Sequence, residues 1–140
     1  MVEVFGLRFV RHYAPPVTAQ ARNVQSVSQI VGQPLSSVVF TMDYLELSFD
    51  SRMLTLLTPV SVHSPAGLVR QGDPGWRDAL CSQVTHIVSA VGMRDDQLCV
   101  DFDTGFSIAA SLRAEDYPGP EAIIFKDGSS LAVFRVDDDV

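Results

Sequence analysis

The chain has 140 residues, of which 46% are hydrophobic and 19% are charged, and its formal net charge is −7 at pH 7. This composition is typical of a folded globular protein, and the length suits a single domain over residues 1–140 with a substantial core. An acidic chain repels phosphate backbones, which argues against a nucleic-acid partner. The sequence also lacks a run of eighteen apolar residues, which argues against a membrane partner.

The N-terminus and the two cysteines predict the compartment. Residues 1–5 contain neither the basic region nor the long apolar stretch of a secretory signal peptide. Cys81 and Cys99 are too few for a disulfide framework, so buried and inert thiols are the preferred interpretation. A disulfide or a reactive thiol is the alternative. Together these features predict a cytoplasmic protein.

The first half of the chain predicts a helix and several short strands. Alternating apolar residues predict a strand within residues 2–13, and a pair of prolines ends it. Valines at helical spacing predict a short helix over residues 23–31, with Asn23 as its N-cap. Strands are predicted next at residues 34–42, 44–49 and 53–58. Residues 61–73 are rich in glycine, proline and polar residues and are predicted to form a surface loop.

The second half begins with a helix signal. Asp73 is a favoured N-cap residue and Pro74 suits the first helical position. Trp76 and Leu80 then share an apolar face, which predicts that both enter the core. Strands are predicted at residues 84–93, 97–102, 106–112, 121–126 and 131–136. The sequence Asp-Gly between the last two strands is the strongest hairpin signal in the chain.

Residues 24–60 and 77–113 resemble each other when the chain is shifted by 53 positions. The identical pairs are Val31 and Val84, Ser36 and Ser89, Val38 and Val91, Asp43 and Asp96, Leu45 and Leu98, Phe49 and Phe102, and Asp50 and Asp103. Each copy predicts a short helix and three strands, whose apolar face needs a cover. The alternative explanation is that both segments show the residue pattern common to β-hairpins, without a duplication.

The predicted fold class is α+β. We expect mostly antiparallel strands from two related helix-plus-three-strand halves, packed as two layers or as a half-open barrel. The core is predicted to contain Leu45, Leu47, Phe49, Trp76, Leu80, Ile87, Val91, Leu98, Val100, Phe102, Ile108 and Ile124.

Common catalytic and metal-binding motifs are absent from the sequence. It contains no EF-hand loop, paired-histidine zinc motif, G-x-S-x-G, phosphate loop or dinucleotide fingerprint. Aspartates at the predicted turns offer oxygen ligands for a cation, but capping of their own turns explains them better. A couple of Cys81 or Cys99 with His86, and acid–base chemistry among Glu115, Asp116 and Glu121, are weaker alternatives. We therefore expect no catalytic residue, metal site or cofactor, and favour a non-catalytic protein.

Six residues are candidates for an interaction site: His63, Arg70, Trp76, Arg77, Arg113 and Glu121. Arginine and tryptophan are enriched at the energetic centres of protein interfaces. For Trp76, a role as the core anchor of its helix is the preferred alternative. A buried pair of Arg113 with Glu121 would instead favour acid–base chemistry.

The second half of the chain resembles a group of uncharacterised small bacterial proteins. The shared pattern is a short helix, a V-x-x-V strand, an L-x-x-x-F-D-x-G hairpin at residues 98–105 and a G-P-E-A segment at residues 119–122. The resemblance implies a bacterial, cytoplasmic, β-rich protein. Some similar proteins lie in toxin–immunity neighbourhoods, which implies an immunity-type role. It brings no functional residues with it.

Two kinds of function remain. The first is a non-catalytic binding protein, immunity-type or regulatory, whose acidic surface speeds capture of a basic partner. Self-association into a homo-oligomer through exposed strand edges belongs to the same class. The second is a small-molecule-binding or enzymatic domain with a pocket between the two halves. A buried, paired charge in a deep pocket would favour the second, and an acidic patch with an apolar rim would favour the first.

Overall fold

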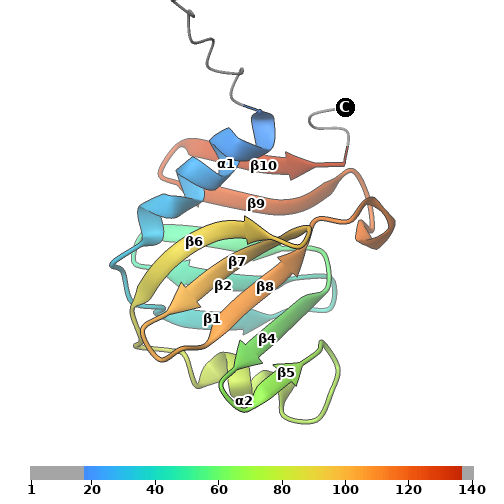
Figure 1. The fold of residues 1–140 in the computed structure, drawn as a ribbon. Coiled ribbons are helices and arrows are strands. Elements are labelled where there is room, and N and C mark those ends of the chain that lie inside the picture. The colour runs from blue at the N-terminus through green and yellow to red at the C-terminus, as the bar shows by residue number, and fades with distance from the viewer. Residues whose placement is uncertain (1–17, 137–140) are drawn as a thin grey trace, which may run out of the picture.

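The computed structural model describes residues 18–136, which form two five-stranded antiparallel sheets with few helices (Figure 1). The helices are α1 (Ala19–Val27) and α2 (Trp76–Cys81), with short 3-10 helices η1 (Ser28–Ile30) and η2 (Ala114–Asp116). The α+β class is confirmed, and the sheets do not close into a barrel. The strand predicted within residues 2–13 lies outside the described residues.

The first sheet has the strand order β1-β2-β3-β9-β10 and the second has the order β5-β4-β8-β7-β6. The strands of the first sheet are β1 (Ser37–Phe40), β2 (Leu45–Phe49), β3 (Arg52–Leu56), β9 (Glu121–Asp127) and β10 (Ser130–Arg135). Those of the second are β4 (Val60–Ser64), β5 (Gly67–Val69), β6 (Val88–Arg94), β7 (Gln97–Phe102) and β8 (Ser107–Ser111). In both sheets, three strands that are consecutive in sequence form a meander, and a hairpin completes the sheet.

The two hairpins are exchanged between the meanders. The hairpin β4–β5 follows β3 in sequence but pairs with β8, with Val62 opposite Ile108. The hairpin β9–β10 follows β8 but pairs with β3, with Phe125 opposite Leu54. Each sheet therefore contains strands from both parts of the chain. The predicted three-stranded units are completed by non-local pairing, which the local sequence pattern does not specify.

Backbone hydrogen bonds between the two repeated segments occur in pairs related by the 53-residue shift. The amide of Gly32 donates to the carbonyl of Val88 at 2.8 Å, and the amide of Thr85 donates to the carbonyl of Leu35 at 2.8 Å. Gly32 and Thr85 occupy matching positions, and both have positive φ angles, of 89° and 81°. The two segments thus take the same backbone conformation where they meet.

A second pair of bonds repeats this relation. Leu35 donates to His86, and Val88 donates to Gln33, each at 3.0 Å. Pro34 and Ile87, which also match under the shift, form an antiparallel bridge with each other. The contact therefore has an approximate two-fold arrangement, as a duplicated unit would give. The duplication itself stays a prediction.

The interior is one hydrophobic cluster to which both sheets and both helices contribute. Phe49, Phe125 and Phe134 are the largest fully buried side chains. Helix α1 packs against β10, whereas α2 lies at the other end of the molecule beside β4 (Figure 1). Of the predicted core residues, three are only partly buried, namely Ile87, Val91 and Ile124. For Val91 the reason is that β6 is an edge strand.

The first helix starts earlier than predicted, so Asn23 is not its N-cap. The hydroxyl of Thr18 accepts a hydrogen bond from the amide of Ala21 at 3.0 Å and caps the helix. Asn23 lies inside α1, and its side-chain amide donates to the carbonyl of Val133 on β10 at 2.8 Å. Polar residues before the valines extend the helix because they are compatible with its exposed face.

The prediction of a loop over residues 61–73 is wrong, because β4 and β5 occupy most of this segment. Val60 and Val62 are buried on one face of β4, a two-residue alternation that polar neighbours obscured. Asp73 is not the N-cap of α2, since Gly75 takes that position with a φ angle of 87°. The side chain of Asp73 instead accepts from the amide of Arg70 at 3.0 Å.

Candidate functional site

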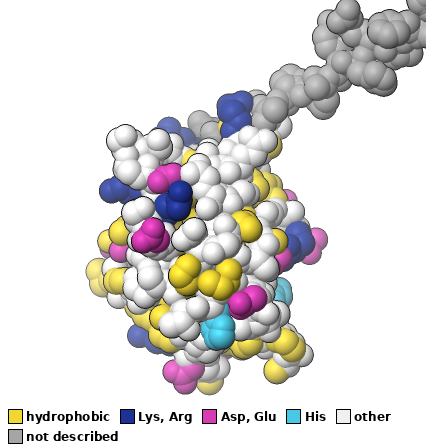
Figure 2. Space-filling view, turned by 90° about the vertical axis from the view of Figure 1, so that its left-hand side faces the viewer, with side chains coloured by type: hydrophobic (Ala, Val, Ile, Leu, Met, Phe, Trp, Pro, Cys, Tyr) yellow, Lys and Arg dark blue, Asp and Glu magenta, His cyan; other side chains and the backbone are white. Residues whose placement is uncertain are grey.

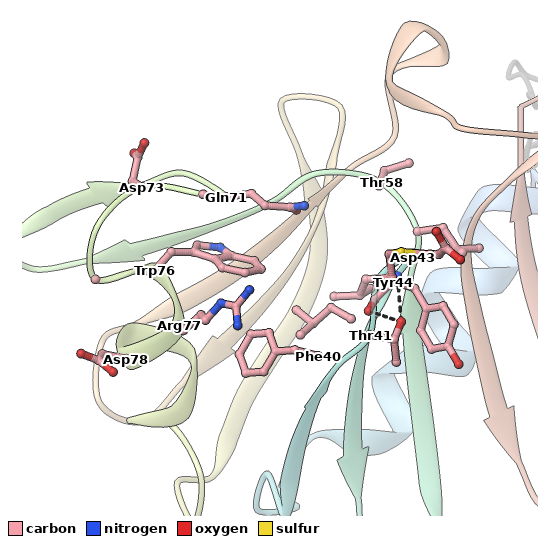
Figure 3. A pocket seen from close by; sticks show the side chains of 16 residues that line it. Phe40, Thr41, Asp43, Tyr44, Thr58, Gln71, Asp73, Trp76, Arg77 and Asp78 are labelled. Carbon is pink, nitrogen blue, oxygen red and sulfur yellow. Dashed lines mark hydrogen bonds between the residues drawn. The ribbon is translucent and has the colours of Figure 1, made fainter.

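A cavity of about 480 Å³ lies between the β1–β2 turn, the end of β3 and the segment that leads into α2 (Figure 3). We call it the Trp76 cavity. It combines residues 40–45 and 56–58 of the first repeated segment with residues 71–78. The cavity therefore lies where distant parts of the chain meet, and the core fixes its walls.

Trp76 forms the inner wall of the Trp76 cavity and is only 7% exposed, as the prediction of a core anchor required. Its indole Nε1 donates to the carbonyl of Val60 at 2.9 Å, so burial leaves no polar atom unpaired. The ring meets that of Phe40 edge to face, with centroids 5.7 Å apart. Trp76 is thus both part of the core and part of the site.

Arg77 lies over the Phe40 ring, with its guanidinium carbon 5.1 Å from the ring centroid. Figure 3 shows the guanidinium beside the two rings, whereas Asp73 and Asp78 point away from them. Among the described residues, the Arg77 side chain forms no ion pair. A stacked guanidinium of this kind has its donors free for a planar anion such as a carboxylate.

The outer rim carries exposed apolar side chains on a well-defined turn. Met42 is 95% exposed and Tyr44 is 38% exposed. The Thr41 hydroxyl accepts from the amide of Tyr44 at 3.0 Å and donates to its carbonyl at 2.8 Å. The turn is therefore held by its own bonds while Met42 projects into solvent, an arrangement typical of contact surfaces.

A second cavity, also of about 480 Å³, lies beside the β6–β7 turn, the end of β8 and the β4–β5 hairpin. We call it the Arg70 cavity. Leu68 and Val60 supply apolar wall, and most of the remaining lining is polar. The hydroxyl of Ser111 donates to the carboxylate of Asp116 at 2.5 Å, which fixes one polar edge.

Five of the six sequence-predicted residues line these two cavities. Trp76 and Arg77 line the first, and His63, Arg70 and Arg113 line the second. The sixth, Glu121, lies on β9 within 3.6 Å of Arg135.

Arg113 is paired with Glu115 and not with Glu121. Its Nε and Nη2 donate to one carboxylate oxygen of Glu115 at 3.1 and 2.6 Å. The Arg113 hydrogen bond lowers the pKa of Glu115 and keeps it ionised. The structure therefore does not assemble the carboxylate group that acid–base chemistry required at residues 115–121.

The other residues considered for chemistry lie as follows within residues 18–136. No group of three histidine, cysteine, aspartate or glutamate side chains there is placed to hold a metal ion. Cys81 is free and exposed, whereas Cys99 is buried, and burial raises the pKa of its thiol. His86 lies 3.6 Å from the carboxylate of Asp103. Asp50 and Asp96 have positive φ angles, as residues at tight turns do.

Sequence reasoning missed most of the residues that line the two cavities, among them Phe40, Met42, Tyr44 and Gln71. A signal was present at Met42, because a large apolar residue in a predicted polar turn is unusual for a free hairpin. No comparable signal marks Phe40, since its alternation with Val38 predicts only a strand. Its contact with Trp76 depends on the tertiary fold.

No protein-family model, curated protein or solved structure matches the chain. No helix within residues 18–136 is long and apolar enough to cross a membrane. The functional conclusion therefore depends on the site itself.

Proposed function

We propose that the chain is a non-catalytic binding module that holds a partner protein at the Trp76 cavity. The observation that carries the proposal is the combination of an almost fully exposed Met42 with the Phe40–Trp76–Arg77 group behind it. Aromatic residues, methionine and arginine are the types enriched at interface centres. A rigid aromatic wall limits the entropy that binding loses.

The charge distribution supports binding of a partner protein more than catalysis on a substrate. The polar side chains that are buried within residues 18–136 are Thr58, Gln83 and Ser111, and none carries a charge. Charged groups of both signs lie on the surface, interspersed with small groups of hydrophobic side chains (Figure 2). An open cavity with exposed charges and an apolar rim matches the pattern expected for protein binding.

A small-molecule-binding function is the second candidate, and one observation favours it. A volume of about 480 Å³ is within the range of ligand pockets. Native mass spectrometry of the protein purified from its host tests this alternative. A bound small molecule that Trp76→Ala releases would support it over protein binding.

We propose a cytoplasmic location, and a second copy of the chain is the alternative partner. The free, exposed Cys81 is compatible with a reducing compartment. Sedimentation of the full chain at several concentrations distinguishes a second copy from a different protein as the partner.

Photo-crosslinking in the native host tests the proposed function. A photo-reactive residue in place of Met42 is expected to capture a defined partner protein. The matched control is the same residue in place of Leu131, which is 63% exposed on β10, an edge strand of the first sheet. Equal capture at both positions, or none at Met42, would contradict the proposal.

A further inference from the structure

The two cavities occupy matching places in the two repeated segments. Under the 53-residue shift, Met42 and Tyr44 of the Trp76 cavity correspond to Asp95 and Gln97 of the Arg70 cavity. Each cavity thus lies between the first turn of a meander and the end of its third strand. The backbone frame is repeated, but the matching turn residues are Met42 and Tyr44 in one cavity and the polar Asp95 and Gln97 in the other.

The two cavities are also neighbours. Thr58 lines the first and Ser111 lines the second, and the Thr58 hydroxyl donates to the carbonyl of Ser111 at 2.6 Å. Gln71 lines both cavities, and its side-chain oxygen accepts from the amide of Val60 at 2.8 Å. Gln71 therefore lies at the boundary between the two cavities.

In each cavity, one arginine forms no ion pair with any residue between 18 and 136. The side chains of Arg70 and Arg77 form no ion pair among the described residues. Four other arginines of the described chain lie within ion-pair distance of a carboxylate: Arg52 of Asp127, Arg94 of Asp101, Arg113 of Glu115 and Arg135 of Glu121. In an acidic protein, two such cations on one short segment leave a place for carboxylates supplied by a ligand.

We infer that the partner protein places one extended segment across the two adjacent cavities, with an apolar side chain against Trp76 and single acidic residues at Arg77 and Arg70. This inference rests on the proposed function. Five aspartates also line the two cavities: Asp43, Asp73 and Asp78 in the first, and Asp95 and Asp116 in the second. They disfavour a continuous acidic run, so the segment carries isolated carboxylates. The net charge of −7 can still attract a partner that is basic as a whole.

The test adds a second photo-reactive position to the Met42 experiment. Leu68 is 44% exposed and lines the Arg70 cavity. A photo-reactive residue in its place is expected to capture the same partner as one at Met42. Mass spectrometry of the crosslinked peptides should place an apolar residue with nearby aspartate or glutamate at the contact. A synthetic peptide of that sequence then serves as the probe for affinity measurements on the full chain.

Variants of the two arginines test whether acidic residues of the peptide contact them. Arg70→Gln and Arg77→Gln should each weaken binding of the peptide by about two- to fivefold, as loss of an exposed ion pair predicts. Lys126→Gln, an equal change of charge at an exposed site on β9, should leave the affinity unchanged. Added salt should remove the difference between the variants and the unchanged protein.

Two results would overturn the inference while the proposed function stands. One is capture of a partner at Met42 but not at Leu68. The other is binding that Arg70→Gln or Arg77→Gln strengthens, which would show that basic groups face these arginines. Capture of a second copy of the chain, or of no protein at all, would also overturn the inference. If Met42 captures no protein, the proposed function fails as well.

Discussion

The two repeated segments share a backbone frame but present different surfaces. In the first, the β1–β2 turn exposes Met42 and Tyr44 next to the rings of Phe40 and Trp76. In the second, the matching turn carries Asp95 and Gln97 beside the Arg70 cavity. The shared frame indicates that folding depends on the strands and their contact, whereas the turns differ between the two segments. We therefore place function in the turns and stability in the shared frame.

The strand exchange makes a specific claim about cooperativity. Because each meander is completed by a hairpin from the other part of the chain, the sheets should unfold together. The predictions below use matched positions of the two segments to test this claim, starting with the largest expected effect.

The largest effect is expected in the core. Phe49→Ala and Phe102→Ala remove matching buried rings, and each should lower the free energy of unfolding by about 3–5 kcal/mol. Both variants should show one transition in urea with unchanged cooperativity, measured by circular dichroism and tryptophan fluorescence. Trp76 reports on the boundary between the segments. Two separate transitions in either variant would break the exchanged-sheet account.

The next effect concerns the matched positions Gly32 and Thr85. Both have positive φ angles, which glycine tolerates and a β-branched residue does not. Thr85→Gly should therefore raise the free energy of unfolding by about 1 kcal/mol, and Gly32→Ala should lower it by about 1–2 kcal/mol. A Cβ atom added at Gly32 would meet nothing within 4 Å, so the backbone alone decides the result.

Chemical denaturation of both variants measures these changes in the free energy of unfolding. The control for Gly32→Ala is Gly92→Ala, because Gly92 has no positive φ angle and also has space for a Cβ atom. If Thr85→Gly proves destabilising, the matched strain in the two segments is not real.

A smaller effect on stability depends on pH and is expected only in the second segment. The hydrogen bond from Arg94 lowers the pKa of Asp101, so the folded state favours the ionised carboxylate. The matching positions of the first segment hold Thr41 and Ser48, which do not titrate. The stabilisation by Asp101 is present above the pKa of an unfolded aspartate and is lost as the pH falls through its lower folded value.

Asp101→Asn should therefore lower stability at neutral pH by less than about 1 kcal/mol, and the difference from the unchanged protein should vanish in acid. Asp103→Asn provides a control on the same hairpin, since it leaves the Arg94 pair intact. Thermal unfolding from neutral pH down to acid measures both variants. A difference that grows as the pH falls would contradict the role given to Arg94.

The smallest effect on stability is expected at Met42. Its side chain is almost fully exposed, so Met42→Ser should change the free energy of unfolding by no more than about 0.5 kcal/mol. The same variant should weaken capture of the partner, because it removes the apolar rim. A loss of stability without a loss of binding would assign Met42 to the fold instead of to the site.

Local sequence patterns predicted much of the secondary structure. Alternation identified β2 and β7, and the Asp127-Gly128 pair located the β9–β10 hairpin. The pairing of β3 with β9 and of β8 with β4 could not be read from the sequence. These pairings join distant segments, and several orders of the same strands satisfy the same alternation.

The candidate site was partly predictable for the same reason. Trp76, Arg70 and Arg77 were identified by residue type. The boundary between the two cavities was not, because Gln71 gains its position from the exchanged hairpin through its bond to Val60. That Arg70 and Arg77 form no ion pair within residues 18–136 also depends on the fold.

Hydrogen–deuterium exchange of the full chain, with and without the captured partner, tests the central claim most directly. The account predicts new protection at residues 40–44 and 70–77, and none at β10, whose Leu131 is exposed. Protection centred on β10, with residues 40–44 and 70–77 unchanged, would contradict the assignment of binding to the Trp76 cavity.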